Sequence, residues 1–145
     1  MLALPADANA AAEVWCCGCG GQLATVGHPG AALAEGAKLG MCTALKLFSS
    51  PSGAPCLAAG YEAGWVVVWA LSAAATGSSA SSSNSNATTC SGTVHAGVLQ
   101  QPLAARQLHE EPVLCIDVDV TGAGGASAGA DARLVLFKLD WAAGG

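Results

Sequence analysis

Three cysteines near the N-terminus come closest to a metal site in residue type and spacing. Cys16, Cys17 and Cys19 lie within four residues, and His28 follows nine residues after the last of them. Thiolate and imidazole are zinc ligands, but ribbons and fingers need a second ligand pair at a suitable distance, and none follows here. The spacing therefore favours cysteines that pack as small apolar side chains, with no metal and no cofactor. A Cys/His metal-binding protein is the alternative.

The sequence His109-Glu110-Glu111 begins like the helix motif of zinc proteases. That motif needs a second histidine four residues after the first, where this chain has Val113, and Pro112 would interrupt the helix. The pattern therefore predicts no protease, and His109 is better explained as a structural histidine beside a strand.

Asp117 and Asp119 form a pair of carboxylates on one face of a predicted strand, because they alternate with Ile116 and Val118. Paired carboxylates can act as general acid and base. Their alternation with apolar residues is more typical of the polar face of a half-buried strand. We therefore predict no catalytic residue, no small-molecule substrate and a protein that is not an enzyme.

The composition limits the function classes further. Charged residues make up 10% of the chain and the net charge is −5, which argues against a nucleic-acid partner. No run of about 18 apolar residues is present, so no membrane span is expected. The apolar content of 52% includes 32 alanines, which bury little area each.

Short apolar runs bounded by turn residues indicate an all-β protein built from antiparallel strands. An N-terminal pair is expected at residues 13–17 and 22–26. The runs that follow span residues 41–48, 55–61, 65–71, 103–108, 113–120 and 134–139.

An internal repeat relates the two halves of the chain. Residues 57–69 and 125–137 both run from small residues through a turn with glycine to an aliphatic stretch that ends in an aromatic residue. Those aromatic residues, Trp69 and Phe137, are 68 positions apart. Removing an insertion of roughly 25 residues leaves about 43, the period of a WD-repeat propeller blade.

The second unit resembles a WD repeat in detail. His109 precedes a strand, Ser127 lies in the next strand, Asp131 lies in the following turn, and Phe137 takes the place of the WD tryptophan. The resemblance implies that these side chains form a buried hydrogen-bonded chain, which ends one link early because phenylalanine has no N–H.

The first unit keeps Trp69 but lacks the polar partners. Ala59, Ala63 and Ala70 stand where the repeat would carry serine and two aspartates. That unit is therefore expected to depend on packing alone.

Four short motifs resemble one family of WD-repeat proteins, the ASTRA-associated protein 1 family, also called guanine nucleotide-binding protein beta-subunit-like. They lie at residues 37–41, 57–69, 109–113 and 139–141. The resemblance implies a scaffold that binds other proteins in an ASTRA/TTT-type assembly, linked to chromatin remodelling and kinase maturation, in the nucleus or cytoplasm. A truncated product without independent function is a further alternative.

The resemblance predicts a partial β-propeller of about two four-stranded blades plus an N-terminal strand pair. Trp65 stands where the family carries a small polar residue, which makes it a candidate partner contact. The expected divisions are residues 1–36 (strand pair and connector), 37–71 (first blade), 72–101 (Ser/Ala-rich disordered insertion), 102–141 (outer strand and second blade) and 142–145 (tail).

Overall fold

A computed structural model of the 145-residue chain describes residues 2–5, 12–15, 22–27, 33, 37–71, 98–99 and 102–141. These residues form β-strands joined by turns and contain no helix, so the expectation of an all-β fold is confirmed. Within those ranges there is accordingly no helix long and apolar enough to cross a membrane. The strands are β1 (Leu2–Pro5), β2 (Ala12–Trp15), β3 (Gln22–Val26), β4 (Cys42–Ser49), β5 (Pro55–Tyr61), β6 (Trp65–Ala70), β7 (Val98–Leu99), β8 (Ala104–Gln107), β9 (Val113–Val118), β10 (Gly124–Gly129) and β11 (Leu134–Lys138).

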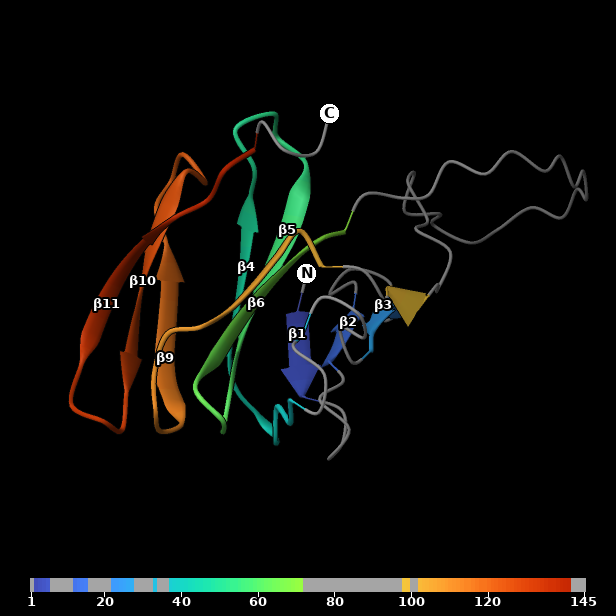
Figure 1. The fold of residues 1–145 in the computed structure, drawn as a ribbon. Coiled ribbons are helices and arrows are strands. Elements are labelled where there is room, and N and C mark those ends of the chain that lie inside the picture. Colours follow the sequence, from blue (N-terminus) through green and yellow to red (C-terminus); the bar gives the residue numbers. More distant parts are fainter. Residues whose placement is uncertain are drawn as a thin grey trace, which may run out of the picture.

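The strands make three sheets that lie side by side (Figure 1). Their strand orders are β1-β2-β3-β7, β4-β5-β6-β8 and β11-β10-β9. Neighbouring strands are antiparallel except for β3 and β7, which run parallel. The strand β8 completes the middle sheet, and the chain then crosses to β9 in the next sheet. The strands described here do not close into a ring.

The N-terminal sheet is larger than the predicted strand pair. The strand β2 begins one residue earlier than predicted and ends at Trp15, and β1 and β7 extend the sheet on either side. Val98–Leu99, at the end of the predicted insertion, form β7, whereas residues 72–97 lie outside the described residues. The third sheet has three strands in the described part of the chain, where four were predicted.

The middle sheet is buried on both faces, because β6 directs alternate side chains to opposite sides. Val67 and Trp69 belong to a cluster shared with the N-terminal sheet, in which Ala12, Val14 and Val26 are buried. Its remaining buried members are Leu33, Leu39, Cys42, Leu57, Ala59, Tyr61 and Leu71. Val66 and Val68 face the third sheet and pack with Ala58, Val113, Ile116 and Val118.

The middle and third sheets approach each other closely at Gly60 and Val113. A Cβ atom on Gly60 would lie 2.5 Å from Cγ1 of Val113, so only glycine leaves room for the valine. Thr43 adds a hydrogen bond between these sheets, because its hydroxyl lies 2.6 Å from the Val113 carbonyl oxygen. This contact fixes the start of β9 and with it the preceding loop, which carries His109.

Candidate functional site

Three polar side chains of the third sheet meet at His109. Its Nε2 atom lies 2.8 Å from Oγ of Ser127, and its Nδ1 atom lies 3.0 Å from Oδ1 of Asp131. A carboxylate only accepts hydrogen bonds, so Nδ1 donates to Asp131. When Nδ1 carries the only ring proton, Nε2 accepts from the Ser127 hydroxyl. The structure thus brings together the three polar residues that the repeat pattern singled out.

Two glycines set the position of the His109 ring. The carbonyl oxygen of Gly64, in the β5–β6 turn, accepts hydrogen bonds from the backbone N–H groups of Leu108 and His109 at 3.0 and 3.1 Å. Gly129, at the end of β10, lies so close to the ring that an added Cβ would be 2.5 Å from Nδ1 of His109. Backbone contacts from both neighbouring sheets therefore hold the imidazole in place.

Asp131 is fixed by the turn that joins β10 to β11. Desolvation raises the pKa of its carboxyl, but hydrogen bonds from the backbone N–H of Glu110, from the His109 ring and from the backbone N–H of Arg133 outweigh it. The net result is that the pKa of Asp131 lies below its ordinary value. The carboxylate is therefore ionised at neutral pH and orients the His109 ring.

Acidification is expected to destabilise the third sheet through Asp131. Because the folded-state pKa is the lower one, its contribution to stability is complete above the unfolded pKa of about 4 and is lost as the pH falls through the folded value. The urea concentration at half-unfolding, measured at a series of pH values, should fall less steeply below about pH 4 in the Asp131→Asn variant than in the unaltered protein. The effect is partial, because the pKa values of Asp117 and Asp119 are lowered too.

The matched control for this pH effect is Glu111→Gln, in the same loop. Glu111 is exposed and makes no hydrogen bond within the described residues. Its replacement should leave the acid dependence of the urea midpoint unchanged. The same acid dependence of the urea midpoint in the Asp131→Asn and Glu111→Gln variants would contradict the stabilising role of the Asp131 carboxylate.

Serine, histidine and aspartate in this order of contacts also make the catalytic triad of hydrolases. Here Ser127 is only 1% exposed and His109 only 2% exposed. A nucleophile must reach the carbonyl carbon of its substrate, and a buried hydroxyl between two packed sheets cannot. The arrangement therefore favours a structural role, in which the three side chains hold β10, the β10–β11 turn and the β8–β9 loop together by hydrogen bonds.

The aromatic residues of the repeat lie apart from this cluster. Phe137 packs with Ile116 and Val118 in the third sheet. Trp69 is fully buried on the other face of the middle sheet, and its Nε1 atom has no hydrogen-bond partner among the described residues. Ala59 stands beside it in the same cluster, where the repeat would carry a serine. The first unit therefore places its tryptophan by packing.

The remaining candidates have ordinary structural positions. Trp65 is half-buried and packs partly against the first cluster. Asp117 is exposed and pairs with Lys46 at 2.7 Å. The strand β9 ends at Val118, one residue before Asp119, which accepts hydrogen bonds from Thr121 in the following turn. The alternation predicted both carboxylates on one strand. That prediction is wrong, because Asp117 lies in β9 and Asp119 lies in the turn that follows it.

The candidate metal ligands of the N-terminal region lie outside the described residues: Cys16, Cys17, Cys19 and His28. The alternative of a Cys/His metal site therefore stays a prediction. The residues whose positions are described contain no group of three or more metal-ligating side chains.

Three described cysteines differ in accessibility. Burial raises the pKa of Cys42 to about 11 and also raises that of Cys56, whereas Cys115 is exposed. Because only a thiolate reacts with iodoacetamide, Cys115 should be alkylated in the native protein at least about tenfold faster than the other two. Peptide mass spectrometry of timed samples at pH 8 measures the three rates. Equal rates under native conditions, with all three equally fast after unfolding, would contradict this burial.

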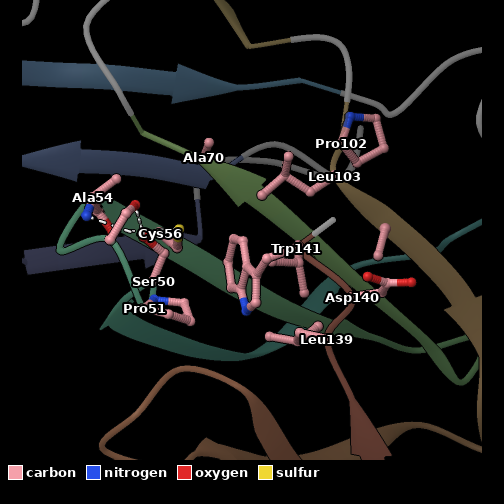
Figure 2. A pocket seen from close by; sticks show the side chains of 13 residues that line it. Ser50, Pro51, Ala54, Cys56, Ala70, Pro102, Leu103, Leu139, Asp140 and Trp141 are labelled. Carbon is pink, nitrogen blue, oxygen red and sulfur yellow. Dashed lines mark hydrogen bonds between the residues drawn. The ribbon is translucent and has the colours of Figure 1, made fainter. Parts of the chain in front are cut away.

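A cavity of 660 Å³ lies between the middle and third sheets at the end of β11 (Figure 2). Trp141 stands within its lining, donates a hydrogen bond from Nε1 to the Gly122 carbonyl at 2.8 Å and packs against Phe48. Cys56 lines the cavity too, but its pKa is raised by burial, so the thiol is protonated at neutral pH. Apart from the carboxylate of Asp140, the lining is aliphatic, aromatic and weakly polar, which favours side-chain packing over catalysis.

No family model matches this chain. Among solved structures, the chain is similar to the crystal structure of the computationally designed Ika4 protein, with a TM-score of 0.52 and 17% sequence identity. The match covers 92% of this chain and 57% of that chain, so this chain spans a little over half the length of its structural neighbour. The similarity concerns the arrangement of the strands alone.

Proposed function

We propose that this chain is a non-enzymatic WD-repeat scaffold that binds other proteins through the surfaces of a partial β-propeller. The observation that carries the proposal is the buried contact of His109 with Ser127 and Asp131. A second feature supports it, because β8 precedes this unit in sequence yet completes the neighbouring sheet. Strands that close one sheet and lead into the next are the mark of blade repeats.

The proposed partners follow from the motifs at residues 37–41, 57–69, 109–113 and 139–141. Their similarity to the ASTRA-associated protein 1 family supports membership of an ASTRA/TTT-type assembly in the nucleus or cytoplasm. In that role the chain would contribute to chromatin remodelling and to the maturation of phosphatidylinositol-3-kinase-like kinases. No catalytic group, cofactor or nucleic acid takes part.

Affinity capture of the tagged chain from its own cells tests this proposal. Subunits of an ASTRA/TTT-type assembly should be enriched over a tag-only control, as measured by quantitative mass spectrometry. Trp65→Ser in the same experiment tests the candidate contact, because Trp65 is only half-buried and its replacement leaves the fully buried Trp69 in place. A folded bait that enriches none of these subunits would overturn the assignment to the assembly.

A further inference from the structure

The third sheet stops one strand short of the sheet that it packs against. The middle sheet ends in β8 and the third sheet ends in β11, and in the described part of the chain no strand pairs with the outer side of β11. Because no strand of the third sheet lies opposite β8, one face of β8 is left uncovered. Ala105 is half-buried against the N-terminal side, whereas Ala104 and Arg106, which face the third sheet, are exposed.

The space left open is a groove of 460 Å³. Val66, Val68 and Ala104 line it from the middle sheet, and Leu136 and Phe137 line it from β11. The groove adjoins the cavity around Trp141, because the two linings share five residues: Val68, Leu103, Ala104, Leu139 and Asp140. The walls are therefore mainly aliphatic.

The free side of β11 also offers hydrogen bonds. On its inner side, Arg133 accepts from the N–H of Gly129, and Leu139 donates to the Ala123 carbonyl. Along an antiparallel pair of strands, residues that bond to the neighbouring strand alternate with residues that do not. The odd-numbered residues of β11 bond to β10, so the even-numbered residues point their N–H and C=O groups away from β10. Leu134, Leu136 and Lys138 therefore present a row of backbone donors and acceptors at this edge.

We infer that the groove along β11 binds one extended strand of a partner protein, which pairs with β11 and covers β8. This is strand addition, in which main-chain hydrogen bonds provide affinity and alternate side chains provide specificity. The inference rests on the scaffold function proposed above, to which it adds the kind of partner.

The surroundings of the groove define the chemistry of that strand. Its inward side chains must be aliphatic, because they meet Val66 and Val68. Two cations, Arg106 and Lys138, and one carboxylate, Asp140, line the groove. Neither cation forms a salt bridge in the part of the chain that is described, so the strand should carry a carboxylate. A second copy of this chain fits less well. Antiparallel pairing of two β11 strands would bring its middle sheet to the side that β6 and β8 already occupy.

A capped, fluorescein-labelled peptide in which valine alternates with threonine, ending in glutamate, tests the inference by fluorescence anisotropy with the full chain. Leu136→Pro removes one outward N–H without touching the bonds to β10 and should raise the Kd at least about tenfold. The Leu136 side chain is 78% exposed and lies on the face of β11 opposite the half-buried Phe137, so only its backbone is expected to pair with the peptide. Leu136→Thr keeps the N–H and should therefore change the Kd by less than about threefold. Arg106→Gln should weaken binding and reduce its dependence on salt.

A peptide methylated at alternate backbone nitrogens has the same side chains but cannot pair with β11, so it should not bind the unaltered chain. Equal binding of the two peptides, equal binding to the Leu136→Pro variant, or no binding up to about 1 mM peptide would overturn the inference. A dimer that Leu136→Pro dissociates in sedimentation would do so too, because a second copy would then be the occupant. Captured ASTRA/TTT-type subunits without peptide binding would leave the scaffold proposal standing.

Discussion

Replacing Trp69 by alanine is expected to destabilise the protein by about 3–5 kcal/mol, the largest effect of any single side-chain truncation among the described residues. The Trp69 side chain is fully buried, with 0% of its surface accessible to solvent. It occupies the cluster that joins the middle sheet to the N-terminal sheet, together with Leu57 and Tyr61. Its loss leaves a cavity that rigid strands cannot close. Equilibrium urea unfolding measures the change.

The matched variant is Trp69→Phe. The indole N–H has no hydrogen-bond partner among the described residues, so its removal loses no bond and only part of the ring volume. This variant should cost less than half as much as alanine. Equal costs for phenylalanine and alanine would show that the N–H, rather than the packing of the ring, holds Trp69 in place.

Replacing Gly64 by alanine is expected to cost about 3 kcal/mol or more, for a backbone reason. Gly64 has a φ of +78°, and an added Cβ would overlap the carbonyl oxygen of His109. That carbonyl belongs to the loop whose N–H groups bond to Gly64, so neither side can move without losing those bonds. The β5–β6 turn and the His109 loop should therefore loosen together.

Gly53→Ala is the control for this effect. Gly53 has a similar φ of +82°, but no atom lies within 4 Å of an added Cβ. Its replacement therefore carries only the cost of the left-handed backbone, about 1 kcal/mol. A Gly64 variant no less stable than the Gly53 variant would contradict the close approach of the His109 loop.

The strands could be predicted from the sequence where apolar residues alternate or cluster between turns. The runs at residues 55–61 and 134–139 agree with β5 and β11 to within a residue, because Val, Leu and aromatic side chains there are bounded by glycine and polar residues. The positions of His109, Ser127 and Asp131 came from a repeat pattern, since their spacing alone does not bring them together. Their contact depends on the turn at Gly129.

Other features left no clear signal in the sequence. The strand β1 is four residues long, and its sequence alone gives no alternation to mark it. Asp119 continues the alternation of β9 but begins the turn to β10, in which its carboxylate accepts hydrogen bonds from the backbone N–H groups of Thr121 and Ala123. The groove beside β11 arises from strand counts in two sheets, which local sequence does not specify.

We infer that the buried contact of Ser127, His109 and Asp131 holds the third sheet together and has no catalytic role. A double-mutant cycle of His109→Leu and Ser127→Ala in equilibrium urea unfolding tests it most directly. We expect each single change to cost about 1–3 kcal/mol and the two effects to couple by about 1–2 kcal/mol. Ser127 should not be labelled by a fluorophosphonate. Additive effects within about 0.3 kcal/mol, or covalent labelling of Ser127 in the folded protein, would contradict it.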